Sequence, residues 1–319
     1  MSWRCGCRAA GLLLTVLLCG LLPGAAVASD DLDYGLTPRK VADDTWVLIG
    51  KTEDFNRSNG GNIVNTAFIV TTEGVVVIDS GPSRRYAQQM RRAIARVTEK
   101  PVIRVFNTHH HPDHFLGNQA FAGIPTSALA ATIAGQKEEG GAFTDNVYRL
   151  SGDWIKGTEP VPAGESLRPG VQSIGGHELE LISLSGHTSG DLVVLDRSTG
   201  VLFAGDLVFY QRAPTTPHAS IAQWLAALDR LATVSYRVLV PGHGDPVGDG
   251  RAIEQTRRYL VWLEDALRRA AERGDEMSEL FGLAIPAEFA AIPLSREEFA
   301  RSVAHLYRRY ESETLRRSR

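Results

Sequence analysis

The stretch Phe106-Asn107-Thr108-His109-His110-His111-Pro112-Asp113-His114 contains four side chains that can bind a metal ion within six residues: His109, His111, Asp113 and His114. An apolar run with β-strand character, residues 102–106, leads into it, so we expect a loop at the carboxyl end of a strand. The loop offers imidazoles and a carboxylate, which are side chains that bind Zn²⁺. Because alternate residues of an extended loop point the same way, His109 and His111 are predicted to share one metal ion. Asp113 and His114, after the turn at Pro112, are predicted to face a second ion.

The spacing His-x-His-x-Asp-His resembles that of the metallo-β-lactamase superfamily, and the resemblance covers most of the chain. It implies further ligands in the order His, Asp, His, each in a loop after a strand. These residues are His187 (in 184–188), Asp206 (in 201–206) and His243 (in 238–244). Asp79, at the end of the apolar run 75–78, matches as well. The implied fold class is α/β, an αββα sandwich, which the pattern of strands and helices also favours.

The resemblance implies two zinc ions as cofactors. His109, His111 and His187 would hold the first ion, Asp113, His114 and His243 the second, and Asp206 would bridge both. A hydroxide shared by the ions would attack a carbonyl, and Asp113 would be the catalytic residue that orients the hydroxide and shuttles its proton. Asp79 would accept the free N–H of a ligating histidine. Manganese and iron remain alternatives because histidine and aspartate suit them too.

The composition indicates which partners to expect. The chain has 319 residues, 43% of them hydrophobic, which suffices for one domain of average to large size with a two-sheet core. The formal net charge of −3 argues against a nucleic-acid partner. We therefore expect a small-molecule substrate, with no membrane association beyond export of the chain.

The N-terminal segment, residues 1–28, has the features of a secretory signal peptide. Arg4 and Arg8 precede an apolar core at residues 12–22, and Ala26-Val27-Ala28 provides a small-residue cleavage site. The apolar core is too short to span a bilayer. All three cysteines, at positions 5, 7 and 19, lie in this segment, so the mature chain is predicted to have no thiolate ligand or cysteine nucleophile. The expected location is the periplasm or the medium.

Residues 29–40 are interpreted as a polar lead-in, 41–275 as the metallo-β-lactamase-type domain and 276–319 as a helical C-terminal extension. Period-2 and apolar runs predict strands, and 3.6-residue periodicity predicts helices. The predicted strands are 45–49, 63–70, 75–78, 102–106, 178–184, 192–195, 201–205 and 237–240, and the predicted helices are 84–97, 220–231, 251–273 and 296–316.

Three further expectations concern local structure. Residues 115–165 are predicted to form an irregular cover with a short helix at 128–136, interrupted by Gly135, Gly140 and Gly141. The pairs Ser220/Gln223 and Ser295/Glu298 have the spacing of capping boxes. The remaining histidines, His110, His177, His218 and His305, are expected to be packed or exposed rather than bound to metal.

Within the superfamily, residues 107–118, 62–70 and 241–244 resemble the periplasmic zinc metallohydrolases that accompany quinoprotein dehydrogenase systems, a group related to SoxH. The favoured activity is hydrolysis of a small ester, thioester, lactone or amide. Specificity is expected to come from residues 51–62, residues 126–165, Tyr210 and Arg212.

The alternatives are a β-lactamase, a non-enzymatic metal-holding accessory protein and, at lower rank, a single-iron oxygenase. The β-lactamase is weakened because Asp206 stands where cysteine-type metallo-β-lactamases have cysteine, and Phe209 where those enzymes have a lysine.

Overall fold

The computed structural model describes residues 1–3, 6 and 32–317, and Asp33–Arg319 form one compact unit. Most of the predicted signal peptide, residues 1–28, lies outside the described residues. In the part of the chain that is described, no helix is both long and apolar enough to cross a membrane.

The first sheet has seven strands in the order β1-β2-β3-β4-β5-β6-β7. The first four strands pair antiparallel, and β4 to β7 run parallel. All four side chains of β4 are buried, as expected for a strand that is covered on both faces. The bounds are β1 Arg39–Ala42, β2 Thr45–Leu48, β3 Thr66–Val70, β4 Val75–Ile78, β5 Val102–Phe106, β6 Thr126–Ala128 and β7 Glu165–Ser166.

The second sheet has five strands in the order β12-β11-β10-β9-β8. β12 lies parallel to β11, and the remaining neighbours pair antiparallel. The β11 strand extends through Asp206 to Phe209, which is longer than the predicted 201–205. The bounds are β8 Gly170–Ile174, β9 His177–Leu184, β10 Asp191–Asp196, β11 Val201–Phe209 and β12 Val238–His243.

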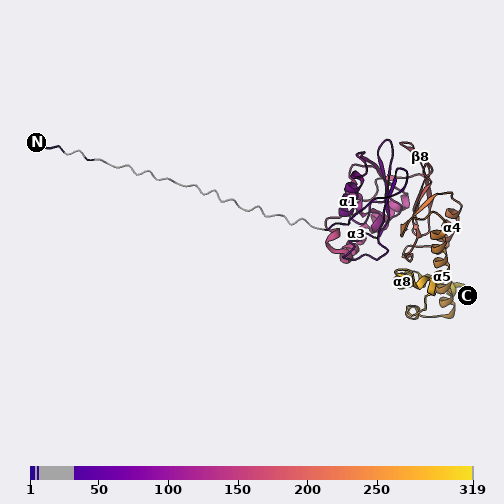
Figure 1. Cartoon of the computed structure of the whole chain (residues 1–319). Helices are drawn as coiled ribbons and strands as arrows, with labels where there is room; N and C mark the ends of the chain where they lie inside the picture. The colour runs from indigo at the N-terminus through magenta and orange to yellow at the C-terminus, as the bar shows by residue number, and fades with distance from the viewer. Residues whose placement is uncertain (4–5, 7–31, 318–319) are drawn as a thin grey trace. The chain divides into compact units, whose positions relative to one another are not determined.

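Helices cover the outer face of each sheet (Figure 1). Helix α1 (Arg84–Ala95) packs Tyr86, Met90 and Ile94 against the first sheet. Helices α4 (Ile221–Ala232), α5 (Arg251–Arg273) and α8 (Ser295–Arg317) share one apolar cluster with the second sheet. A separate cluster, which includes Phe106 and Phe203, lies between the two sheets. The predicted αββα sandwich with additional C-terminal helices is therefore confirmed.

The prediction of an irregular cover over residues 115–165 is wrong, because α3 is a continuous helix over Ala130–Ser151. The three glycines lie within this helix, and at two of them neighbouring groups come too close for a larger side chain. A Cβ on Gly135 would lie 2.7 Å from the His110 ring, and one on Gly140 would lie 2.8 Å from Pro160. The shorter helices are α2 Pro112–Phe115, α6 Met277–Leu280 and α7 Ala287–Ala290, and the 3₁₀ turns are η1 Leu116–Phe121 and η2 Gly152–Ile155.

Neither predicted capping box forms. Ser220 precedes α4, but its side chain makes no capping hydrogen bond and Gln223 is exposed. The Ser295 hydroxyl donates to the Phe289 carbonyl oxygen. Glu298 is fully buried, and its carboxylate pairs with arginine side chains because a buried charge needs an opposite one.

Candidate metal centre

All seven residues predicted as metal ligands lie at one edge of the sandwich, where the carboxyl ends of strands from both sheets meet. The loop after β5 supplies His109 and His111, and the β9–β10 loop supplies His187. Close packing between β11 and β12 is possible because residue 242 is glycine. A Cβ at Gly242 would lie only 1.9 Å from Oδ1 of Asp206.

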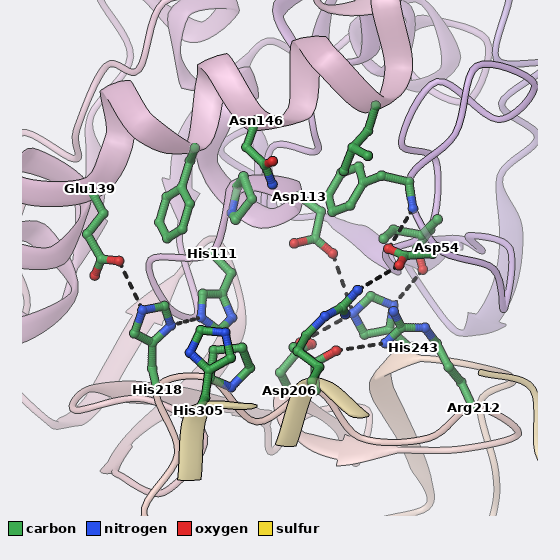
Figure 2. Close-up of a pocket in the computed structure, with 18 residues that line it drawn as sticks. Asp54, His111, Asp113, Glu139, Asn146, Asp206, Arg212, His218, His243 and His305 are labelled. Carbon is green, nitrogen blue, oxygen red and sulfur yellow. Dashed lines mark hydrogen bonds and ion pairs between the residues drawn. The ribbon is translucent and has the colours of Figure 1, made fainter. Parts of the chain in front are cut away.

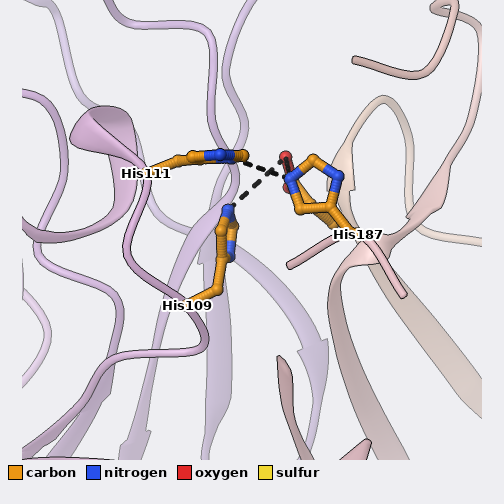
Figure 3. A group of neighbouring side chains, drawn as sticks. His109, His111 and His187 are labelled. Atoms are coloured by element: carbon orange, nitrogen blue, oxygen red, sulfur yellow. Dashed lines mark hydrogen bonds and ion pairs between the residues drawn. The ribbon is translucent and has the colours of Figure 1, made fainter. Parts of the chain in front are cut away.

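His109, His111 and His187 converge with Asp206 on one point (Figure 3). Nε2 of His187 lies 2.8 Å from Nδ1 of His111, and the His109 ring lies 4.8 Å from each of the other two ring centroids. Oδ2 of Asp206 lies 3.3 Å from Nε2 of His187 and 3.8 Å from Nε2 of His109. These four buried residues could hold one metal ion.

Asp113, His114 and His243 form a second group that could hold a metal ion. Oδ2 of Asp113 lies 3.4 Å from Nε2 of His243 and 3.7 Å from Nε2 of His114. Asp206 reaches this group too, with Oδ1 3.1 Å from Nε2 of His114 and Oδ2 3.2 Å from Nε2 of His243. The Asp206 carboxylate therefore lies between the two groups.

Buried acceptors orient two of the imidazoles. Nδ1 of His114 lies 2.7 Å from Oδ2 of Asp79, and the backbone N–H and hydroxyl of Thr108 also donate to Asp79 at 2.8 Å. Nδ1 of His243 lies 2.7 Å from the backbone oxygen of Ile63, to which it donates. In its neutral form, each ring then carries its proton on Nδ1 and presents a bare Nε2 to the cluster.

The protonation states suit metal binding. Burial and neighbouring imidazoles hold the pKa of His109 and His111 well below the usual 6.5, and burial lowers the pKa of His187 to about 3. Burial alone would raise the pKa of Asp206, but the imidazoles around it bring that pKa well below its ordinary value. Three neutral imidazoles and one ionised carboxylate thus face one another.

His114 differs from the other predicted ligands. Burial would lower its pKa, but the carboxylates of Asp206, Asp79 and Asp113 raise it well above 6.5. Among the described residues, Nε2 of His109 is buried without a hydrogen-bond partner, and Nε2 of His114 and Oδ1 of Asp206 face each other at 3.1 Å. Buried polar atoms are nearly always paired, so an unpartnered Nε2 on His109 fits a divalent cation at this position.

A cavity of about 390 Å³ opens beside this cluster (Figure 2). Phe55 lines it from the 51–62 loop, and Phe143 and Leu150 line it from α3. Arg212 follows β11 and also lines the cavity, whereas Tyr210 is absent from its wall. Helix α8 adds Arg301 and His305, a contribution that the sequence did not indicate.

His218, which was expected to be packed or exposed, is partly exposed and also contacts a predicted metal ligand, which the sequence did not indicate. Nδ1 of His218 lies 2.8 Å from Nε2 of His111. His110 is buried against Glu139, and His177 bonds Asp196 at 2.8 Å outside the cavity wall. No local motif marks His218, since its position depends on how the loop before α4 folds back over the cluster.

The protein has two stacked sheets between helices, and it has a candidate metal centre of histidines and aspartates at the edge of the sheets. Residues 59–243 match the family model described as the metallo-beta-lactamase superfamily. The chain belongs to this superfamily.

The chain is similar to proteins with several different activities. A linear primary-alkylsulfatase from Pseudomonas sp. is 22% identical over 75% of this chain, which spans only 53% of that protein. Acyl-coenzyme A thioesterase MBLAC2 from Gallus gallus is 26% identical over 63% of this chain and 79% of its own length. The structure of a metallo-beta-lactamase from Pontibacter korlensis superposes with a TM-score of 0.58 at 25% identity, covering 71% of this chain and 99% of that one.

Proposed function

We propose that this protein is a dinuclear zinc hydrolase that acts on a small ester, thioester, lactone or amide. The observation that carries this proposal is the position of Asp206. One of its oxygens lies 3.3 Å from His187 and the other lies 3.1 Å from His114, so a single carboxylate reaches both ligand groups. A carboxylate in this position suits two cations about 3.5–4 Å apart.

His109, His111 and His187 would hold one zinc ion, and Asp113, His114 and His243 the other, with Asp206 shared. The chemistry that bound zinc supplies is Lewis acidity toward a carbonyl oxygen and a lowered pKa for a water nucleophile. Asp113 lies at the cavity wall and would orient that water and accept its proton. Asp79 and the Ile63 carbonyl keep the rings of His114 and His243 aligned.

The cavity supports a small, partly apolar substrate. Its volume of about 390 Å³ is in the range of small-molecule sites, and Phe55, Ile63, Phe143 and Leu150 give it an apolar wall. A similar thioesterase and a similar alkylsulfatase agree with attack on an acyl or sulfuryl centre beside an apolar chain. We favour an acyl substrate because this chain spans 79% of the similar thioesterase but only 53% of the similar alkylsulfatase.

For the compartment, we propose the periplasm or the medium, and a role accessory to a quinoprotein dehydrogenase system. The compartment is supported by the signal-like segment 1–28 and by the lack of cysteine from residue 29 onward, which suits an oxidising compartment. The accessory role is supported by the resemblance of residues 107–118 to the periplasmic zinc metallohydrolases related to SoxH. Fractionation of expressing cells checks this point. Protein of full length retained in the cytosol would contradict it.

Metal analysis of the purified protein, followed by a hydrolysis panel of short esters, thioesters, lactones and amides, tests the activity. Two zinc ions per chain are expected, and Asp113→Asn should lower kcat by 10² or more, as loss of a general base does, in order-of-magnitude terms. His177→Gln, in a buried His–Asp pair away from the cavity, is the control. Full zinc content without turnover on any substrate would favour the metal-holding accessory protein, and one iron ion per chain would favour an oxygenase.

A β-lactamase is the second candidate function. It is favoured by the likeness to metallo-beta-lactamase structures and by Arg212, a guanidinium that lines the cavity and suits a substrate carboxylate. Nitrocefin turnover well above that of Asp113→Asn would support it. Turnover of thioesters or lactones without nitrocefin hydrolysis would exclude it.

A further inference from the structure

Glu139, His218 and His111 form a row along one side of the cavity (Figure 2). Oε2 of Glu139 lies 2.9 Å from Nε2 of His218, and Nδ1 of His218 lies 2.8 Å from Nε2 of His111. The three residues come from α3, from the loop before α4 and from the loop after β5. The opposite nitrogen of His111, Nδ1, faces the candidate metal position beside His187.

The chemistry of the three groups fixes where each proton lies. An ionised carboxylate only accepts hydrogen bonds, so Nε2 of His218 carries the proton shared with Glu139. In a neutral imidazole the other nitrogen is then an acceptor, so Nδ1 of His218 accepts the Nε2–H of His111. His111 is thereby held in the tautomer that leaves Nδ1 with a free lone pair directed at the cluster.

We propose that His218, held by Glu139, is a positioning residue that sets the tautomer and ring orientation of His111 for the first zinc ion. This inference rests on the proposed metal centre. Asp79 performs the corresponding task for His114, and the Ile63 carbonyl for His243. His218 differs from both because its own side chain is about one-third exposed and it lines the cavity.

Phe143 lies beside this row. Its ring centroid lies 6.1 Å from that of His111 and 6.2 Å from that of His218, in edge-to-face geometry. The aromatic ring limits the access of water to the His218–His111 hydrogen bond, and a bond that is shielded from water is stronger. Glu139 and Phe143 are four residues apart on α3, so one face of this helix supplies both the carboxylate and the cover.

Zinc affinity and ¹⁵N NMR of the histidine side chains test the proposal. His218→Ala removes the acceptor and should weaken binding of the first zinc ion, the one proposed for His111, about 10–100-fold in chelator competition. His218→Asn places an amide oxygen near the former Nδ1 and should recover most of that loss. Glu139→Gln should fall between them. His177→Ala, which removes a histidine from a buried pair outside the cavity wall, should leave the affinity unchanged.

The NMR measurement separates failure of this proposal from failure of the proposed function. In metal-free protein, His111 should carry its proton on Nε2, and His218→Ala should shift that population while thermal unfolding shows that the variant is folded. An unaltered zinc affinity in His218→Ala, or a third zinc ion that is lost in this variant, would overturn the positioning role. Absence of zinc binding by the unaltered protein would overturn the proposed function, and the ¹⁵N spectrum would still decide whether His218 sets the tautomer.

Discussion

Asp79 and His114 lie 35 positions apart in the chain, yet Oδ2 of Asp79 is 2.7 Å from Nδ1 of His114 in the interior. Asp79 also has a left-handed backbone conformation, with φ 59°, which is uncommon outside glycine, asparagine and aspartate. Its carboxylate accepts from the backbone N–H and the hydroxyl of Thr108 as well. These hydrogen bonds offset the cost of the backbone conformation, and they hold the carboxylate against the histidine ring.

Asp79→Asn should therefore weaken binding of the zinc ion that we propose His114 holds about 10–100-fold. Asparagine tolerates the same backbone conformation. However, an NH₂ group would replace one carboxylate oxygen, and NH₂ cannot accept a hydrogen bond from Thr108 or His114. Chelator competition on the purified variant measures the change. Asp196→Asn is the matched control, because Asp196 also accepts from a buried histidine, His177, at 2.8 Å but outside the cavity wall. Equal zinc affinities in the two variants would contradict the prediction.

The metal-free protein should be most stable near pH 6.5. The pKa values of His109, His111 and His187 are depressed in the folded state, so unfolding takes up protons below about pH 6.5 and stability falls as the pH is lowered. Each such imidazole contributes up to about 1.4 kcal/mol per pH unit. The pKa of His114 is raised, so its contribution is present below about pH 6.5 and is lost as the pH rises through its folded-state value.

Urea unfolding midpoints at acid, near-neutral and alkaline pH check this prediction of a maximum. Zinc should flatten the alkaline side, because a metal ion displaces the His114 proton and stabilises the folded state by an amount that grows with the logarithm of its concentration over Kd. A midpoint that climbs steadily from pH 6.5 to 8.5 in metal-free protein would show that the predicted sign for His114 is wrong.

Two glycines of α3 should respond oppositely to the same substitution. Gly135→Ala puts a Cβ 2.7 Å from the buried His110 ring, so it should destabilise the protein despite the higher helix propensity of alanine. Gly141→Ala meets nothing within 4 Å and should stabilise the protein by about 0.5–1 kcal/mol. Thermal unfolding of both variants measures the difference, and a stabilised Gly135→Ala would refute the close approach.

Glu298 on α8 should be important for stability. Its carboxylate is fully buried and pairs with Arg212 at 3.2 Å and Arg301 at 2.7 Å. Glu298→Gln leaves a buried guanidinium without an ionised partner, which should cost about 3–5 kcal/mol in the free energy of unfolding. The exposed neighbour gives the control, since Glu297→Gln should change stability by less than about 0.5 kcal/mol. Similar urea midpoints for the two variants would argue against the buried network.

The sequence alone indicated the ligand set and the sandwich. Residues 102–106 form a strand that leads into the His109–His114 loop, and the α5 bounds are those that the apolar periodicity predicted. Strand and helix periods are local properties of the chain, so they can be read without tertiary structure. Predictions from local spacing were wrong where a tertiary contact was stronger. Glu298 was predicted to cap a helix, but it forms buried ion pairs with Arg212 and Arg301 instead.

Tertiary structure alone decided which other residues meet the ligand cluster. His218 reaches His111 across 107 positions, and Arg301 of α8 pairs with Asp54 across 247 positions. Such contacts depend on how helices and loops from both ends of the chain pack around the sheets, and no motif of fixed spacing records them. The sequence thus determined the groups that could hold metal, whereas packing determined the cavity beside them and the side chains that orient them.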